Sequence, residues 1–366
     1  MKITSRVLAN LLCLCIAAQA ADQTIVLKAA RLFDGKSNAL LQNAVVIVQG
    51  DKIVDVGSDL PVPSGVQVID LGDATLCPGF MDAHTHLTAD FSGNYNERRL
   101  QQLDLNVSEH AIRATAFARA TVEAGFTTVR DLGSRFVASH EFVDVALRNS
   151  INKGVIVGPR MLIATKGIGA TGGHFDPTNG FRDFLFGREP DYTDGIANGP
   201  DEIRKAVRFE VKNGADVIKA AVSGGVLSLV DEVDTPQLTP AEMAALVDES
   251  HRLRKKVAVH CHGDQAAREA IEAGVDSIEH GSFMKPETLT MMKKKGTFLT
   301  PTLMASEWIM GKLDNYPPAL QAKAKAAYRA RSEMFRNAVK MGIKISFGTD
   351  AAVFPHGQDK TRKNSS

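Results

Sequence analysis

Cysteine is scarce in this chain, and neither sign of charge predominates. Four cysteines occur in 366 residues, and two of them, Cys13 and Cys15, lie in the apolar segment at the N-terminus. The other two, Cys77 and Cys261, cannot form a disulfide-based scaffold, although an oxidising compartment would permit one bridge between them. Lys and Arg total 43 against 42 for Asp and Glu. This balance excludes the strongly basic surface typical of nucleic-acid-binding proteins, and no basic run marks a membrane-binding surface.

The amino-terminal segment differs in composition from the rest of the chain. Lys2 and Arg6 precede an apolar run over residues 8–18, and alanines at positions 18 and 20 form a cleavage-site pattern. These features predict a signal peptide over residues 1–20, and a buried N-terminal helix is the alternative. The run is too short to span a membrane. We therefore expect a secreted or periplasmic protein with no membrane anchor.

Residues 21–76 predict short strands separated by turns. The runs are rich in β-forming residues, and Gly50-Asp51 is a turn signal between two of them. We interpret this region as the N-terminal part of a small β-domain. The predicted strands cover residues 24–27, 44–49, 52–56 and 66–71.

Residues 77–357 predict alternating strands and helices. This alternation favours a parallel sheet, and eight strands favour a (β/α)8 TIM barrel, which is an α/β fold. The helix expected over 239–253 begins with Thr239 as N-cap, Pro240 in the first turn and Glu242 as the capping-box glutamate. Other helices are expected at 108–124 and 201–213. The expected barrel strands are 75–80, 127–130, 160–164, 217–220, 256–260, 277–279, 297–301 and 344–347.

The strongest local signal is the pair His84 and His86. Side chains separated by one residue in an extended segment project to the same side. Both imidazoles can therefore reach one metal ion at the end of the first barrel strand.

Three further predicted strands end in residue types that bind metals, namely His260, His280 and Asp350. The C-terminal ends of barrel strands form the face that carries TIM-barrel active sites. Four imidazoles and one carboxylate at one rim favour a metal site over a role in packing. His262 follows His260 by two positions, and strand alternation places both on one side, so either is a candidate ligand.

Lys219 ends an apolar predicted strand, where an unpaired ammonium group would be costly to bury. Three interpretations are open: a Schiff-base lysine as in some barrel aldolases, a lysine carbamylated by carbon dioxide that bridges two metal ions, and a buried structural ion pair. The surrounding histidines favour the carbamate.

These residues resemble the amidohydrolase superfamily, specifically its binuclear branch with a carbamylated lysine. Within that superfamily, segments 80–86, 278–281 and 348–351 are similar to the imidazolonepropionase-related group, which contains Xaa-Pro dipeptidases and ochratoxin-type amidases. True imidazolonepropionases use one metal and lack the bridging lysine, so Lys219 argues against that activity. The resemblance covers residues 24–357 and implies the metal ligands His84, His86, Lys219, His260, His280 and Asp350.

The resemblance implies a metal-dependent hydrolase that cleaves amide bonds in small substrates, such as Xaa-Pro or other dipeptides or N-acyl amino acids. Two Zn²⁺ ions per chain, bridged by carbamylated Lys219, would share the attacking hydroxide, and Asp350 would be the catalytic proton carrier. Manganese or cobalt would suit similar ligands. His174, on a Gly-rich loop, and His262 are the candidate substrate contacts. The alternatives are a lactonase- or esterase-type binuclear hydrolase and an inactive metal-binding protein.

The match to the family stops after residue 357. Beyond this point, family members continue with a helix and with strands that complete the small β-domain. Residues 358–366 form a polar tail that we expect to be disordered. We also expect apolar surface to be exposed beside the last barrel strand, and a homo-oligomer is one way to cover it.

Overall fold

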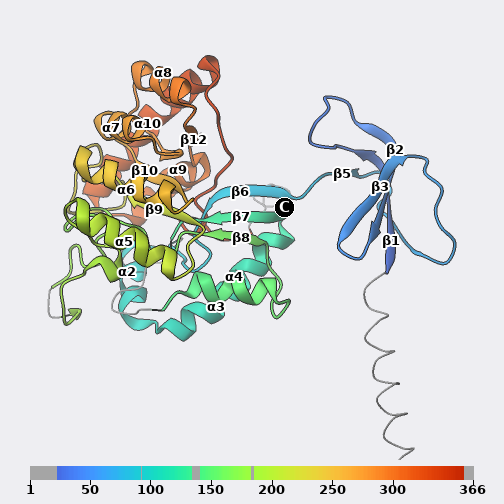
Figure 1. The fold of residues 1–366 in the computed structure, drawn as a ribbon, viewed down its shortest axis with the longest axis horizontal. Coiled ribbons are helices and arrows are strands. Elements are labelled where there is room, and N and C mark those ends of the chain that lie inside the picture. Colours follow the sequence, from blue (N-terminus) through green and yellow to red (C-terminus); the bar gives the residue numbers. More distant parts are fainter. Residues whose placement is uncertain (1–22, 92, 134–140, 183–184, 358–366) are drawn as a thin grey trace, which may run out of the picture. The chain divides into compact units, whose positions relative to one another are not determined.

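The computed structural model describes residues 23–91, 93–133, 141–182 and 185–357 (Figure 1). The chain divides into two compact units, Met1–Gly79 and Phe80–Ser366. The predicted signal peptide at 1–20 and polar tail at 358–366 lie outside the described residues. Within the described ranges, no helix has the length and apolar character needed to cross a membrane.

The first unit is a five-stranded sheet ordered β3-β2-β1-β4, with β5 also paired to β1. Strand β1 runs antiparallel to β2 and parallel to β4 and β5. Leu32, Ala44 and Val46 form its buried cluster. The strands are β1 (Thr24–Leu32), β2 (Leu41–Gln49), β3 (Lys52–Ser58), β4 (Gln67–Asp70) and β5 (Thr75–Leu76).

The expectation that residues 75–80 form the first barrel strand is wrong for Thr75 and Leu76. Strand β5 extends the small sheet, because Leu76 pairs with Leu32 of β1. The barrel begins with β6 (Phe80–Thr85). Pro78 separates the two strands, and proline cannot donate a ladder hydrogen bond.

The second unit contains the TIM barrel that the strand–helix alternation predicts. Parallel ladders join β6, β7 and β8 in one sheet and β9 to β12 in another. The predicted strand 344–347 makes only an isolated bridge, between Ile345 and Leu299. The remaining barrel strands are β7 (Phe126–Asp131), β8 (Arg160–Ile163), β9 (Val217–Ala221), β10 (Lys256–Cys261), β11 (Ser277–His280) and β12 (Phe298–Thr300).

Backbone hydrogen bonds outside the regular ladders connect the two sheets. Beyond β8, the Ile168 N–H donates to a carbonyl of β9 at 2.8 Å. On the opposite side, Ser346 donates to Leu299 at 2.9 Å and Ala83 donates to Phe347 at 2.8 Å. Residues 344–347 therefore take the position of the eighth strand without forming a regular ladder.

Helices follow the strands, and α3 and α4 lie beside β7 and β8 (Figure 1). Helix α6 begins as predicted: the Glu242 carboxylate accepts from the Thr239 N–H at 2.7 Å, and the Glu242 N–H donates to the Thr239 hydroxyl at 3.3 Å. This capping box satisfies N–H groups that the helix leaves unpaired. The helices are α2 (Tyr95–Asp104), α3 (Val107–Glu123), α4 (Val143–Asn152), α5 (Pro200–Lys212), α6 (Pro240–Arg252), α7 (Asp264–Ala273), α8 (Pro286–Lys295), α9 (Leu303–Met310) and α10 (Pro318–Met341).

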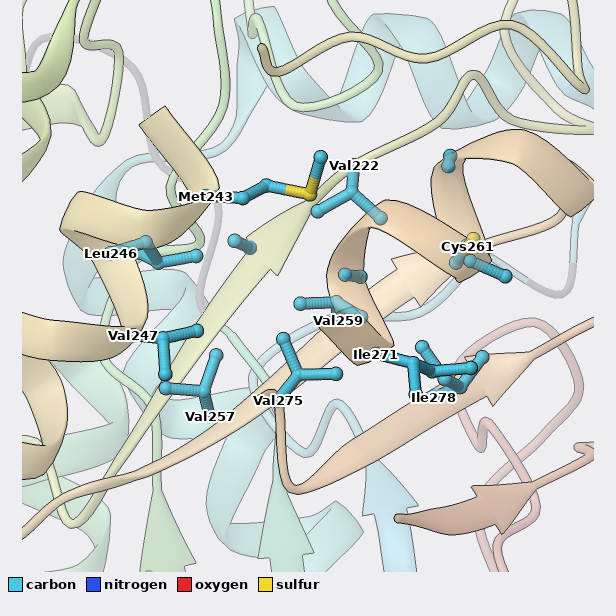
Figure 2. Packing of buried hydrophobic residues seen from close by; sticks show 14 of the residues in the cluster. Val222, Met243, Leu246, Val247, Val257, Val259, Cys261, Ile271, Val275 and Ile278 are labelled. Atoms are coloured by element: carbon cyan, nitrogen blue, oxygen red, sulfur yellow. The ribbon is translucent and has the colours of Figure 1, made fainter. Parts of the chain in front are cut away.

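The main hydrophobic core lies between the second sheet and the helices that cover it. Figure 2 shows Val257 and Val259 of β10 packed with Leu246 of α6 and Ile271 of α7. All four side chains are fully buried. The helices thus bury the outer face of these strands, as parallel sheets require. This burial explains why the strands appear in the sequence as apolar runs.

Large apolar side chains are exposed at the first and last barrel segments. Phe80 and Phe347 are each 56% exposed, Ile112 on α3 is 70% exposed and Val339 on α10 is 56% exposed. The Phe126 ring lies 5.9 Å from that of Phe80 and 5.7 Å from that of Phe347, between ring centroids. This is the exposed apolar surface expected beside the last barrel segment.

Two carboxyl groups are buried behind the barrel, on helices α4 and α5. Burial raises the pKa of Asp144 to about 7 and that of Glu210 to about 8. One Glu210 oxygen accepts from the Lys166 N–H at 3.2 Å, and the other has no hydrogen-bond partner among the described residues. Glu210 is therefore largely protonated at neutral pH.

Replacing Glu210 by Gln should change how stability depends on pH. Its folded-state pKa of about 8 lies above the ordinary value of 4.5, so its stabilising contribution is fully present below the unfolded pKa and is lost as pH rises through the folded pKa. The free energy of unfolding of Glu210→Gln, relative to wild type, should therefore increase between about pH 5 and pH 8. Urea denaturation of metal-free protein measures this. The exposed Glu123→Gln is the control, and parallel profiles for Glu210→Gln and wild type would contradict the prediction.

An ion pair crosses the barrel interior between β7 and β11. The Arg130 guanidinium donates to Glu279 at 2.7 Å, and the Ser277 hydroxyl donates to the same carboxylate oxygen at 2.6 Å. Arg130 also donates to the Ala83 carbonyl of β6 at 2.6 Å. Glu279 is fully buried, so its charge depends on these donors.

Replacing Glu279 by Gln should lower the free energy of unfolding by about 3 kcal/mol or more, because removing one partner leaves the other charge uncompensated. The matched control is Glu123→Gln, which breaks the exposed pair that Glu123 forms with Arg119 at 3.3 Å and should cost less than about 1 kcal/mol. Equal losses in the two variants, measured by urea denaturation, would show that the buried pair has no special role.

Candidate active site

One cavity lies at the C-terminal ends of the barrel strands, and the structure brings every predicted site residue to it. We call it the central cavity. The predicted residues that line it are His84, His86, His174, Lys219, His260, His262, His280 and Asp350.

His84 and His86 project together from the end of β6, as their spacing predicts. Their Nε2 atoms lie 3.5 and 3.4 Å from the same oxygen of Asp350. On the other side of each ring, His84 Nδ1 lies 2.8 Å from Glu279, and His86 Nδ1 lies 3.0 Å from the Gly133 carbonyl. These acceptors fix Nδ1 as the protonated nitrogen and leave the Nε2 lone pair on the side of Asp350.

Two groups of three residues have ligand atoms within 4.8 Å of one another, a spacing that fits a metal ion. The first group is His84, His280 and Asp350, and the second is His260, His262 and His280. His280 belongs to both. The donor atoms are imidazole nitrogens and a carboxylate, which zinc prefers. The arrangement therefore fits two adjacent ions.

In two of these histidines, the Nδ1 atom contacts a neutral hydroxyl group. His262 Nδ1 lies 2.8 Å from the Ser282 hydroxyl, and His280 Nδ1 lies 2.7 Å from the Thr302 hydroxyl. His260 differs, because its Nε2 lies 3.1 Å from the Gly224 carbonyl. Both His260 and His262 therefore belong to the set of candidate ligands.

Lys219 lies at the centre of β9 and is 1% exposed. Its charge lowers the pKa of His84 and adds to the effects that lower that of Asp350. The charge of Lys219 is also one of the causes that lower the pKa of His262, so Lys219 acts electrostatically on residues of both candidate metal groups. A carbamate at this position would replace a cation that repels metal ions with an anion that binds them.

Three imidazoles of the central cavity, those of His84, His262 and His280, are held neutral. Burial lowers the pKa of His84 to about 4 and lowers those of His262 and His280 well below the ordinary value. Burial alone would raise the pKa of Asp350, but His84 and His86 outweigh it and hold that pKa below its ordinary range. Neutral imidazoles and an ionised carboxylate are the forms that bind metals.

The backbone is strained at three of these positions. His280 has a φ of 73°, Asp350 of 61° and Thr302 of 47°. Residues other than glycine rarely adopt these left-handed values, and such strain concentrates at functional sites.

His174 lies on the loop after β8 and stacks on His260, with ring centroids 4.2 Å apart. A Cβ atom on Gly225 would lie 2.1 Å from the His174 ring. Glycine at this position therefore permits the two loops to approach closely, because it has no Cβ atom. This close approach allows His174 to line the cavity.

Sequence reasoning missed Glu279 and Arg331. Glu279 holds His84, and its signal was a glutamate directly before a candidate metal ligand in a short predicted strand. Arg331, on α10, is 5% exposed and lines the central cavity. Its sequence neighbourhood is a polar helix that resembles any solvated face, so no local signal marks it. Asp131, at the end of β7, accepts from the Leu87 N–H at 2.5 Å.

The cysteines take no part in this arrangement. Cys77 is exposed and Cys261 is buried, and both are free thiols. Burial raises the pKa of the Cys261 thiol above its ordinary range, which makes it a poor nucleophile.

The amidohydrolase family matches this chain over residues 75–364. Ochratoxinase of Aspergillus niger is 28% identical over 328 residues, which cover 85% of this chain and 66% of ochratoxinase. The chain thus spans just under two thirds of the length of that relative.

Solved structures agree with this assignment. A Xaa-Pro dipeptidase with methionine bound in its active site is 38% identical, with a TM-score of 0.84 over 92% of this chain and 81% of that one. A prolidase complexed with N-methylphosphonate-L-proline is 28% identical, with a TM-score of 0.78 over 90% of this chain and 78% of that one.

These findings confirm the resemblance on which the sequence-based prediction depends, including the likeness to the Xaa-Pro dipeptidase and ochratoxinase group. They also identify the chain as an enzyme of the hydrolase class. The chain belongs to the amidohydrolase family.

Proposed function

We propose that this enzyme is a metal-dependent hydrolase of amide bonds in small substrates, such as Xaa-Pro or other dipeptides or N-acyl amino acids. The observation that carries the proposal is the convergence of the six candidate ligands on one cavity, with His280 common to two groups of metal-binding geometry. Ochratoxinase, the Xaa-Pro dipeptidase and the prolidase, all similar to this chain, support the amide as the scissile bond.

Two zinc ions fit the donor set best. His84, His86 and Asp350 would hold one ion, and His260 and His280 would hold the other, with carbamylated Lys219 between them. His262 is an alternative ligand of the second ion, because it belongs to the same group of three histidines. When bound, the ions supply an activated water and polarise the scissile carbonyl.

The side chains of the central cavity have distinct roles in this proposal. Asp350 accepts the proton of the attacking water and returns it to the leaving nitrogen. Glu279 keeps His84 in the orientation that presents Nε2. His174, on the cavity wall beside His260, is a candidate substrate contact in this proposal.

The proposed substrates are small molecules found outside the cytoplasm, because the signal-peptide pattern at residues 1–20 favours export. The exposed Phe80 and Phe347 are compatible with a homo-oligomer.

Lys219→Ala should abolish tight binding of about two zinc ions per chain and lower kcat/KM on a dipeptide panel by more than about 100-fold, since residues that merely orient ligands already contribute about 10- to 100-fold. The control is Lys166→Ala, because Lys166 is also buried (3% exposed) but does not line the cavity. Elemental analysis and steady-state kinetics, with bicarbonate present, make the measurement.

Three results would count against the proposal. Full activity in Lys219→Ala would exclude the bridging lysine. Tight metal binding by the wild type without turnover of any dipeptide or N-acyl amino acid would indicate an inactive metal-binding protein. Faster hydrolysis of matched esters or lactones than of amides would indicate an esterase-type hydrolase.

A further inference from the structure

Asp82 is a buried carboxylate between the first barrel strand and the last barrel segment. It is 3% exposed and does not line the central cavity. Its Oδ1 atom accepts from the His84 N–H at 3.0 Å and from the Thr349 N–H at 3.1 Å. Its Oδ2 atom accepts from the Thr349 hydroxyl at 2.5 Å. One side chain therefore joins β6 to the residue that directly precedes Asp350.

These bonds form part of a ring around the backbone of His84. The His84 N–H is connected to Thr349 through the Asp82 carboxylate, and the His84 carbonyl accepts directly from the Asp350 N–H at 2.7 Å. The Thr349 hydroxyl also accepts from the Ala351 N–H at 3.2 Å. The carboxylate thus supplies acceptors for N–H groups at a place where the last barrel segment forms no regular ladder with β6.

The ring determines where two candidate ligands lie. His84 and Asp350 belong to the same candidate metal group, and His84 Nε2 lies 3.5 Å from an Asp350 oxygen. Asp350 has a φ of 61°, a left-handed value that a residue other than glycine keeps only when its surroundings hold it. The bonds of the Thr349 and Asp350 N–H groups supply such support. Asp82 therefore acts on the separation of the two ligands through their backbone.

The other candidate metal group has no such connection to Asp82. Its members are His260, His262 and His280, which lie at the ends of β10 and β11. Among the described residues, the Asp82 side chain forms hydrogen bonds with His84 and Thr349 alone. Loss of the carboxylate should therefore disturb the group of His84, His280 and Asp350 and leave the group of three histidines in place.

We propose that Asp82 is a positioning residue for the metal centre, because it holds His84 and Asp350 at the separation that their shared metal ion requires. The inference rests on the proposed function, in which the cavity binds metal ions. Asp82 acts through the backbone of two ligands and contacts neither the ion nor the substrate. A role in stability alone would weaken the fold without changing how many ions the folded chain holds.

Asp216 is a matched control, because its carboxylate also joins two neighbouring barrel strands. It precedes β9 and accepts from the Ile163 N–H of β8 at 3.1 Å and from Arg148 at 2.7 Å. It does not line the central cavity. Neither of its partners belongs to a candidate metal group. Replacing Asp216 therefore removes a carboxylate between strands without loosening either group.

The first test counts the zinc ions that the folded chain holds. After reconstitution with zinc and bicarbonate and dialysis against a weak chelator, wild type and Asp216→Ala should keep about two ions per chain. Asp82→Ala should keep about one, because the ion of His84 and Asp350 should bind about 10- to 100-fold more weakly, the range for residues that orient metal ligands. Elemental analysis gives the count, and circular dichroism shows that each variant is folded.

Two further variants separate the position of the ligands from charge and from folding. Asp82→Asn keeps an Oδ1 acceptor for both N–H groups and should retain both ions. Thr349→Val removes the hydroxyl partner of Asp82 and should weaken binding of the same ion by a smaller factor, since the Thr349 N–H bond remains. In the Asp82→Ala background, Thr349→Val should add little, because both substitutions remove the same bond.

The outcomes separate this inference from the proposed function. An unchanged zinc count and affinity in Asp82→Ala, or an equal loss in Asp216→Ala, would overturn the inference and leave the proposed function intact. If Asp82→Ala does not fold, the zinc affinity of Thr349→Val decides, and an unchanged value overturns the inference. A wild type that holds no zinc tightly would refute the proposed function and the inference with it.

Discussion

The structure depends on the backbone hydrogen bonds between β6 and the last barrel segment. Ala83 donates to Phe347 at 2.8 Å, and Asp350 donates to His84 at 2.7 Å. These bonds bring residues far apart in the sequence into one site, because they place the Asp350 carboxylate beside the two histidines at the end of β6. The barrel must be closed before these three side chains can meet, so formation of the site and completion of the fold are one event.

The buried charges of the barrel interior favour one arrangement of the closed barrel. Glu279 joins Arg130 on one side to His84 on the other, so one buried carboxylate stabilises the barrel and orients a candidate ligand. Buried ion pairs contribute little net stability compared with apolar packing, but they disfavour arrangements in which a charge is left alone. The network thus favours the single register in which His84 presents Nε2 to the central cavity.

Local patterns were sufficient to predict much of the fold and the candidate ligands. The short segments that end in His260, His280 and Asp350 mark the rim of the barrel, because parallel strands deliver their C-terminal residues to one face. The C-terminal boundary of the small sheet was harder to predict, because Thr75–Leu76 pairs with β1, which is distant in the sequence. Arg331 was not predictable, because only packing of α10 on the cavity distinguishes it from an exposed helical arginine.

The charge of the cavity bears on the proposed metal site. With Lys219 as an ammonium, cations surround Asp350, and two divalent ions would be repelled. Carbamylation would reverse the sign of the charge at this position and would add an oxygen ligand to the cavity. Arg331 remains cationic in either state, since its pKa is lowered by burial only to about 10. With both ions in place, Asp350 and the carbamate would be the anionic ligands, because a histidine binds a metal ion in its neutral form.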